Sequence, residues 1–292
     1  MNNILYHGSP IGNLTVLKPH ASTHMNNYVY ATTDPAIALI FSVEGHGDLD
    51  FDLRMVDGKI IFTERREGAF VKYNSSGYLY TLDSANFKNM DNLWEMEVVS
   101  ENEERILSCE YVSNILKRLE EYAKKGKMII YRYPTKPDFL PKDDSDLVEK
   151  YIGFEKMGHR GAIDNMLFAF PKLRQKVFDI LETPTTFYYV GKKTDEFSNI
   201  IVYDNILDAI ECADKSIFVR EDGWINYNII DSKFCFEKGN FNFDDDFYIY
   251  EVKGKCDRIS AHSFNLSDVQ IISSNKIDFN NYIANEVKKV SK

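Results

Sequence analysis

Cysteine is scarce in this chain of 292 residues, and its four cysteines are widely separated: Cys109, Cys212, Cys235 and Cys256. No two of them form a Cys-x-x-Cys pair, and no histidine stands at metal-ligand spacing from any of them. Structural zinc sites and redox-active dithiols depend on such pairs, so we expect no metal. Isolated cysteines are typical of reduced thiols, and we therefore expect a cytoplasmic protein, with an exported toxin that lacks a conventional signal as the alternative.

Long apolar runs are also missing. No stretch approaches the ~20 apolar residues that a membrane-spanning helix needs, and the first residues show no basic segment followed by an apolar run. We therefore expect no membrane partner. The chain also lacks a glycine-rich phosphate loop, so a Rossmann or P-loop nucleotide fold has no support.

Basic residues are outnumbered by acidic ones, with 35 Lys and Arg against 45 Asp and Glu and a net charge of −10. Residues 1–126 alone carry 12 basic and 18 acidic residues, a balance of −6. Broad, non-specific binding to nucleic acid needs a positive surface, so this balance argues against it. Residues 127–184, with 10 basic and 9 acidic residues, are the place to look for a local basic groove.

Aromatic residues are plentiful, with 20 Phe and 18 Tyr, and many stand in short runs typical of strands. Thr33 or Asp34 is expected to cap a helix that has Pro35 in its first turn. We also predict helices over residues 110–125 and 146–182, the second interrupted near Gly158. Strands are predicted at residues 4–7, 28–31, 59–63, 68–73, 77–82, 96–99, 128–133 and beyond residue 186. The expected fold class is α+β, with strongly curved, mostly antiparallel sheets packed with helices.

Three segments of the amino-terminal half form one pattern. The first is Tyr6-His7-Gly8-Ser9, the second runs from Tyr30-Ala31 to Phe41-Ser42, and the third is Glu95-Met96-Glu97-Val98-Val99-Ser100. In residue type and order they resemble the ADP-ribosyltransferase superfamily of the His-Tyr-Glu type, to which diphtheria toxin, the poly(ADP-ribose) polymerases and the rifampin-modifying ADP-ribosyltransferases belong. The resemblance covers residues 4–107.

The resemblance implies an NAD-dependent mono-ADP-ribosyltransferase, with NAD as a substrate and nicotinamide as the leaving group. It implies Glu97, His7 and Tyr30 as catalytic residues. The residues expected to bind NAD are His7, Gly8, Ser9, Tyr30, Ala31, Phe41 and Ser42.

Each of these roles has a physical reason. Backbone groups at Gly8 can pair with the nicotinamide carboxamide because glycine permits close approach. Tyr30 and Phe41 can stack on the two faces of the ring, and His7 can hold a ribose by a hydrogen bond. The charge of Glu97 favours the oxocarbenium-like state that forms as nicotinamide departs, and the same carboxylate can orient or deprotonate the nucleophile.

The chain departs from the family pattern at two places. Some relatives have Tyr where Phe41 stands, and Phe can stack but cannot donate a hydrogen bond. Glu95 precedes Glu97 by two residues, which on a strand directs both side chains to one face. This spacing resembles the arginine-modifying branch, which normally has Arg in place of His7, so the chain mixes two patterns.

The carboxy-terminal half contains segments similar to those of the amino-terminal half, in the same order. Four segments match: residues 187–191 resemble 4–8, 200–212 resemble 28–42, 247–250 resemble 77–80, and 269–273 resemble 96–100. We therefore expect a catalytic domain at residues 1–126, a helical connector at 127–184 and a degenerate copy of the first fold at 185–292. In this copy Val190 stands at the place of His7, and Gln270 at the place of Glu97.

Two charged runs have a less specific interpretation. Glu64-Arg65-Arg66-Glu67 is expected to be a solvated turn, or alternatively to place Arg65 or Arg66 on a pyrophosphate. Asp244-Asp245-Asp246 lacks the spacing of a calcium loop and is expected to be a charged turn.

Other functions stay open beside ADP-ribosyl transfer. Transfer of an RNA 2′-phosphate to NAD is a sister chemistry, but it requires basic residues that the acidic balance of residues 1–126 does not favour. A non-catalytic nucleotide-binding or protein-binding module is the second alternative, and intact His7, Tyr30 and Glu97 argue against it. The acceptor is equally open between a protein, a nucleic acid and a small molecule.

Overall fold

The computed structural model describes residues 4–21, 27–45, 47–90, 93–159, 161–193, 195–213, 228–230, 233–235 and 247–276. The chain divides into two compact units, residues 1–142 and 143–292, which are considered separately below. Both combine curved, mostly antiparallel sheets with a few helices, which confirms the expected α+β class. The structural division lies inside the predicted connector 127–184. The predicted turn at Asp244-Asp245-Asp246 lies outside the described residues.

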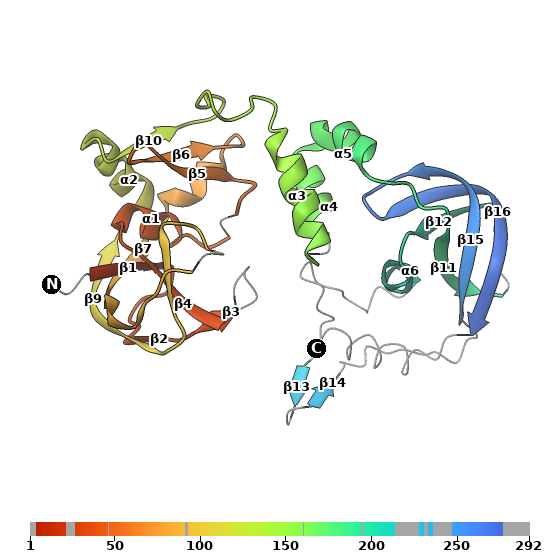
Figure 1. Ribbon diagram of the computed structural model, residues 1–292, viewed down its shortest axis with the longest axis horizontal. Coiled ribbons are helices and arrows are strands. Elements are labelled where there is room, and N and C mark those ends of the chain that lie inside the picture. The colour runs from red at the N-terminus through yellow and green to blue at the C-terminus, as the bar shows by residue number, and fades with distance from the viewer. Residues whose placement is uncertain are drawn as a thin grey trace. The chain divides into compact units, whose positions relative to one another are not determined.

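A seven-stranded antiparallel sheet forms the main body of the first unit (Figure 1). Its strand order is β2-β9-β7-β1-β4-β3, and β8 also pairs with β4. The strands are β1 (Ile4–Ser9), β2 (Val16–Leu17), β3 (His20–Ala21), β4 (Asn27–Thr32), β7 (Gly77–Asp83), β8 (Glu97–Ser100) and β9 (Glu104–Val112). Consequently β1, β4 and β8, which carry the three motifs, are consecutive neighbours.

A smaller sheet and several short helices complete this unit. The sheet has the order β10-β6-β5, and β10 runs parallel to β6. Its strands are β5 (Phe51–Val56), β6 (Lys59–Glu64) and β10 (Met128–Tyr131), and the helices are α1 (Pro35–Ile40), η1 (Ala69–Asn74), η2 (Ser84–Asn86) and α2 (Ile115–Lys124). As predicted, Asp34 caps α1, because its Oδ1 accepts a hydrogen bond of 2.8 Å from the Ala36 N–H.

Two hydrophobic cores lie on the two faces of the main sheet. The larger contains the buried residues of α1 and α2 together with Phe51, Phe62 and Leu79, so it joins the helices to both sheets. The smaller core lies on the opposite face and consists of Leu5, Leu17, Val29, Ala31 and Leu82. Side-chain alternation along β1 and β4 accounts for this division, because neighbouring residues of a strand face opposite sides.

Two secondary-structure predictions in this unit are wrong. Residues 68–73 were expected to be a strand but form most of η1, which follows Gly68 with its left-handed φ of 76°. Phe70 and Tyr73 are fully buried at the three-residue spacing of a 3-10 helix, whereas Val71 is 63% exposed. The helix predicted from residue 110 begins only at Ile115, capped by Asn114, because the preceding residues belong to β9.

The described residues of the second unit form several short helices and a closed four-stranded barrel (Figure 1). The helices α3 (Asp146–Lys156), α4 (Ala162–Ala169) and α5 (Arg174–Ile180), with η3 (Pro171–Leu173), confirm the predicted helical region and its interruption. The barrel has the order β11-β12-β16-β15, and its interior is filled by Phe187, Val202, Val252, Phe264 and Leu266. Its strands are β11 (Phe187–Lys192), β12 (Asn199–Tyr203), β15 (Phe247–Arg258) and β16 (Ser263–Lys276), accompanied by α6 (Ile206–Ala213) and the pair β13 (Asn228–Ile230) and β14 (Lys233–Cys235).

Among the described residues, no helix has both the length and the apolar character that crossing a membrane would require.

Helix α1 lies unusually close to β1 at Gly8. A Cβ atom at this position would lie 1.8 Å from the Ala38 carbonyl oxygen, so only glycine permits the observed packing. We predict that Gly8→Ala forces α1 away from β1 and lowers the free energy of unfolding by about 1–3 kcal/mol, the range for overpacked cores. Thermal or denaturant unfolding measures this loss. The matched control is Gly47→Ala, because a Cβ at Gly47 meets nothing within 4 Å, and equal destabilisation by both variants would contradict the prediction.

Candidate functional site

The three motif-bearing strands place Tyr30 and Glu97 on one face of the main sheet. Thr32 of β4 pairs with Tyr6 of β1 on one side and with Glu97 of β8 on the other, and Tyr30 pairs with Val99. Because side chains two residues apart share a face, Tyr30, Thr32 and Glu97 point the same way. Tyr30 and Glu97 are then diagonal neighbours, a relation that corresponds to a spacing of about 7–8 Å.

His7 lies at the seam between β1 and β4. Strict alternation along β1 would direct His7 to the face opposite Tyr6 and Glu97. This alternation holds, because β1 stays paired with β7 through His7, opposite Tyr80. The expectation that His7 and Glu97 share one face of the sheet is therefore not met at the Cβ of His7, although no residue of β4 pairs with His7. Its Nδ1 is 2.8 Å from the Tyr30 carbonyl oxygen. The imidazole therefore contacts the strand that carries Tyr30.

The environment of His7 favours the neutral imidazole. Burial lowers the pKa of His7, the hydrogen bond to the Tyr30 carbonyl raises it, and the charge of His20 lowers it further, with a net decrease. A carbonyl oxygen can only accept, so Nδ1 carries the proton and donates to Tyr30. In this tautomer Nε2 is the acceptor nitrogen, which suits a hydroxyl donor such as a ribose.

Helix α1 covers the same face of the sheet as Tyr30 and Glu97. Gly8 is two residues from Tyr6 on β1, so both residues face the same side of the sheet. A Cβ atom on Gly8 would meet the Ala38 carbonyl of α1. The helix ends at Phe41, a half-buried residue whose ring meets Phe51 edge to face at 6.3 Å. Gly8 is therefore explained by helix packing independently of any ligand.

Three of the expected NAD-binding residues have structural partners. The Ser9 hydroxyl accepts a hydrogen bond of 3.1 Å from the Ile11 N–H. The Ser42 hydroxyl donates one of 2.7 Å to the Leu39 carbonyl and is fully buried. Ala31 packs in the smaller core, on the face away from Tyr30. These residues hold the backbone around the motifs.

The structure brings His20 to the site, which sequence reasoning did not. His20 of β3 pairs with Tyr28, and its ring meets the Tyr30 ring edge to face at 6.3 Å. Tyr28 packs on Tyr30 in the same manner at 6.0 Å. The sequence shows His20 only in a polar stretch with no periodicity, so its place beside β4 carries no local signal.

Glu95 does not share the strand of Glu97. Strand β8 begins at Glu97, whose N–H donates 2.8 Å to the Trp94 carbonyl, and Glu95 is an exposed residue of the preceding turn. The argument that both side chains face one way required a strand, so it does not apply. Glu97 itself is half-buried.

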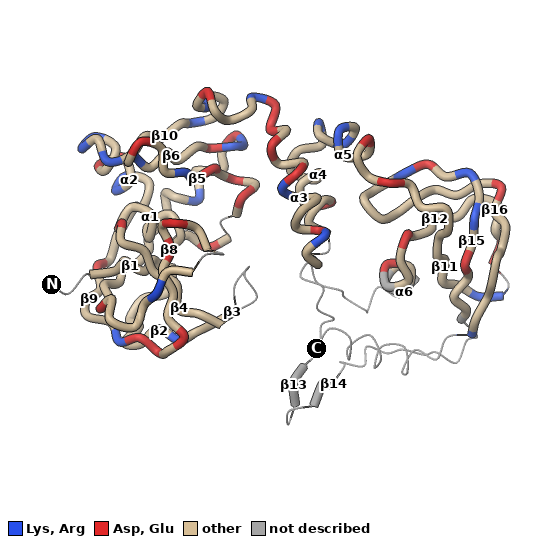
Figure 2. Tube along the Cα trace, in the orientation of Figure 1, with Lys and Arg blue, Asp and Glu red and all other residues tan. Residues whose placement is uncertain are grey.

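The run from Glu64 to Glu67 is the expected solvated turn only in its second half, where Arg66 is half-buried and Glu67 is exposed. Glu64 and Arg65 are each only 3% exposed. Glu64 accepts hydrogen bonds from the Phe70 and Tyr133 N–H groups, and Arg65 forms an ion pair of 3.0 Å with Asp52. Basic and acidic residues both occur along the hairpin formed by β5 and β6 (Figure 2). The sequence shows that these residues are charged, but it does not show which residues of opposite charge lie beside them and permit their burial.

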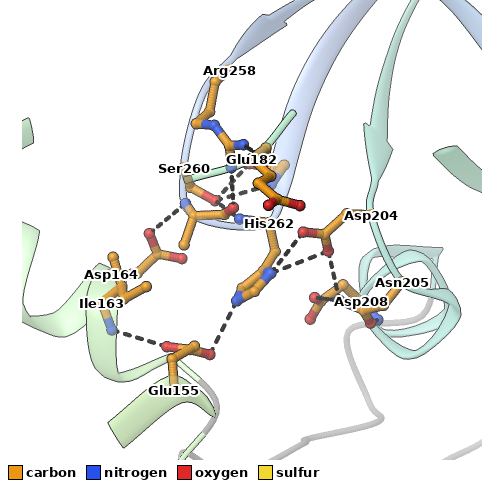
Figure 3. Close-up of polar contacts among 12 residues, drawn as sticks. Glu155, Ile163, Asp164, Glu182, Asp204, Asn205, Asp208, Arg258, Ser260 and His262 are labelled. Carbon is orange, nitrogen blue, oxygen red and sulfur yellow. Dashed lines mark hydrogen bonds and ion pairs between the residues drawn. The ribbon is translucent and has the colours of Figure 1, made fainter. Parts of the chain in front are cut away.

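A second polar cluster, in the carboxy-terminal unit, is centred on His262 (Figure 3). Its Nδ1 lies 2.9 Å from Asp204 and its Nε2 lies 3.0 Å from Glu155. Glu155 also accepts hydrogen bonds from the Gly161 and Ile163 N–H groups at the start of α4. One imidazole thus connects α3 to the end of β12. These residues are 58 and 107 positions apart from His262, so no sequence motif reveals them.

The two carboxylates keep His262 protonated. Burial lowers the pKa of His262, but hydrogen bonds and charges from Asp204 and Glu155 outweigh this effect and raise the pKa to about 9. Asp204, Asp208 and His262 also place three ligand atoms within 4.8 Å of one another, as a cation site would. Because both ring nitrogens of His262 face carboxylates, we describe the cluster as an ion-pair network.

We predict that the stability contributed by His262 depends on pH. Because the pKa is raised from 6.5 to about 9, the contribution is complete below pH 6.5 and is lost as the pH rises through about 9. Near pH 6, His262→Gln should lower the free energy of unfolding by about 2 kcal/mol, the scale of hydrogen bonds to charged groups. Urea unfolding of both proteins from pH 6 to 10 measures the difference. A difference that stays constant over this range would contradict the ion-pair interpretation.

Comparison with known proteins gives no match to a protein family, to a curated protein or to a solved structure. The case for a function therefore depends on the residues of the chain and on their arrangement. Of the expected site residues, the sheet brings Tyr30 and Glu97 to one face, places His7 against Tyr30, and positions Phe41 at the end of the helix above Gly8.

Proposed function

We propose that the amino-terminal unit is an NAD-dependent mono-ADP-ribosyltransferase that releases nicotinamide and transfers ADP-ribose to an acceptor. The observation that carries the proposal is the adjacency of β1, β4 and β8, with Tyr30 and Glu97 as diagonal neighbours on the face that α1 covers. The three segments are up to about ninety residues apart in the chain, and a chance resemblance of sequence would not require their strands to be neighbours.

The end of pairing between β1 and β4 supports the role of Gly8. Successive residues of an antiparallel strand direct their backbone groups alternately to the two neighbouring strands. Beyond the Tyr6–Thr32 rung, β1 continues to pair with β7 but no longer with β4. Backbone groups of β1 on the β4 side are then suited to pair with a carboxamide, and Tyr30 and Phe41 offer rings for the nicotinamide.

In the proposed reaction, the bond between the ribosyl C1′ and the nicotinamide nitrogen breaks, and its electron pair leaves with nicotinamide. The positive charge that develops on the ribose is favoured by the Glu97 carboxylate. An acceptor nucleophile then bonds to C1′, and its proton passes to a base, for which Glu97 is the candidate. His7, neutral and with Nε2 as acceptor, receives a hydrogen bond from a ribose hydroxyl.

The alternative transfer of an RNA 2′-phosphate is less well supported. It would need basic residues around the site to bind phosphate, and the balance of 12 basic against 18 acidic residues in 1–126 does not favour it. A non-catalytic nucleotide-binding or protein-binding module remains the alternative from another class, and nicotinamide release from NAD by the purified protein distinguishes it from an enzyme.

We further propose that the carboxy-terminal unit is a copy of the first fold without its chemistry. Strand β11 pairs with β12 at one rung, Tyr188–Tyr203, and with β15 over six, as β1 pairs with β4 and β7. Strand β12 pairs with β16 and is followed by α6, as β4 pairs with β8 and is followed by α1. Unlike β7 and β8, β15 and β16 pair with each other and close a barrel.

The rungs of this unit suggest a different equivalence from the sequence comparison. If Tyr188–Tyr203 corresponds to Tyr6–Thr32, Tyr189 rather than Val190 stands at the place of His7. Ser263, which pairs with Tyr203, then stands at the place of Glu97, instead of Gln270. Neither equivalence provides a carboxylate to favour a developing cation, so both agree with a unit that lacks the proposed activity.

We predict that Glu97→Gln lowers turnover by roughly 10²- to 10³-fold, the scale for losing one preorganised electrostatic group, while NAD affinity changes little. The substitution keeps the shape of the side chain and removes its charge. The measurement is nicotinamide release from NAD, together with transfer of label from NAD to fractions of a cell lysate. Glu95→Gln is the matched control, because Glu95 is exposed and lies outside β8. Equal turnover in Glu97→Gln and the wild type would remove Glu97 from the mechanism.

A further inference from the structure

The loop between α1 and β5 connects two aromatic residues that touch each other. It starts directly after Phe41, the last residue of the α1 cap, and ends directly before Phe51, the first residue of β5. The two rings meet edge to face at 6.3 Å. Phe51 in turn contacts Phe62 at 5.3 Å and Tyr73 at 6.5 Å, and all three are buried. The ring of Phe41 therefore rests on a fixed aromatic core.

Two cations from outside the loop hold it in place. The Lys72 Nζ donates 2.6 Å to the Gly45 carbonyl and 2.7 Å to the Asp50 carboxylate. The Arg66 Nε donates 3.1 Å to the Leu49 carbonyl, and its Nη2 forms an ion pair with Asp50. Asp50 thus receives both cations, and we call Asp50, Arg66 and Lys72 the loop clamp.

Burial makes the Asp50 carboxylate the centre of this clamp. Its side chain is 8% exposed, compared with 28% for Lys72 and 42% for Arg66. A buried carboxylate requires its cations, because removing them leaves a charge without compensation in a medium of low polarity. The Asp50 backbone is also fixed, since its N–H donates to the Gly47 carbonyl and its carbonyl accepts from the Arg65 N–H.

We propose that Asp50, through the loop clamp, is a positioning residue that holds the Phe41 ring where it stacks on nicotinamide. This inference rests on the proposed function, because it concerns the ring that Phe41 would contact. An aromatic side chain fixed before binding avoids the loss of conformational freedom that a mobile one undergoes, so the clamp increases affinity for the nicotinamide end of NAD. In this proposal the loop clamp does not touch the ribosyl C1′ at which the reaction takes place.

The experiment compares how the protein binds the nicotinamide end of NAD with how it binds the ADP-ribose end. We expect Asp50→Asn to weaken product inhibition by nicotinamide by about 3- to 10-fold, the range for freeing one ordered side chain. The KM for NAD rises by a similar factor and kcat stays within about 2-fold, as for a contact equal in the ground and transition states. Inhibition by ADP-ribose, which lacks the nicotinamide ring, stays unchanged, a selectivity that a general loss of structure would not give.

Asp52→Asn is the matched control. Asp52 is two residues away, on β5, and is likewise paired with two cations, Arg54 and Arg65, but it does not bind the cations that hold the loop. We expect it to leave nicotinamide inhibition unchanged. Should Asp50→Asn fail to fold, Lys72→Gln removes one cation of the clamp and has the same expected selectivity.

The outcomes distinguish this inference from the proposed function. Unchanged nicotinamide inhibition in Asp50→Asn, equal weakening of nicotinamide and ADP-ribose, or the same effect in Asp52→Asn would each overturn the positioning role. A wild-type protein that releases no nicotinamide and binds neither compound would instead overturn the proposed function, and this inference with it.

Discussion

The close approach of α1 to β1 at Gly8 is the constraint on which the candidate site depends. A helix normally packs on a sheet through side chains, but here the Ala38 carbonyl occupies the space that a Cβ of Gly8 would fill. The helix therefore lies low over the face that carries Tyr30 and Glu97. Its last residue, Phe41, comes to this face for the same reason. The His-Gly pair thus has two separate functions, with Gly8 placing the helix and His7 contacting Tyr30.

The second constraint is the short ladder between β1 and β4. One rung at Tyr6 and Thr32 is enough to set the relative orientation of the two strands. Beyond this rung, the imidazole of His7 donates a hydrogen bond to the Tyr30 carbonyl of β4. In a longer ladder, backbone N–H groups of β1 would have paired with this strand instead. The lowered pKa of His7 follows from burial at this seam. A single feature of strand pairing therefore determines both the position and the protonation of this side chain.

Local rules predicted the parts of the fold that local interactions determine. The Asp34 cap and the strands at β1, β4, β6 and β7 were recognisable because caps and alternation act within a few residues. The strand predicted at residues 68–73 is wrong because the aromatic composition of this segment favours a strand, whereas Gly68 and the burial of Phe70 and Tyr73 favour a 3-10 helix. The burial of Arg65 could not be predicted, since it depends on Asp52, thirteen residues away on the paired strand. His20 reached Tyr30 through strand pairing, which periodicity in one segment does not reveal.

Carboxylates that bind several partners perform the same task in both units of this acidic chain. In the first unit Asp50 receives Arg66 and Lys72 and so holds the loop that follows Phe41. In the second unit Asp204 and Glu155 hold His262 between them, and Glu155 also binds N–H groups at the start of α4. Each cluster joins elements that the chain alone leaves far apart, and each loses its attraction when one charge is removed. Part of the acidic excess therefore serves to fix loops and helix ends, so net charge alone describes the surface of this protein poorly. In and after the β5–β6 hairpin, Arg54 and Arg65 bind Asp52, while Arg66 and Lys72 bind Asp50, so each of these two carboxylates fixes two cations at once.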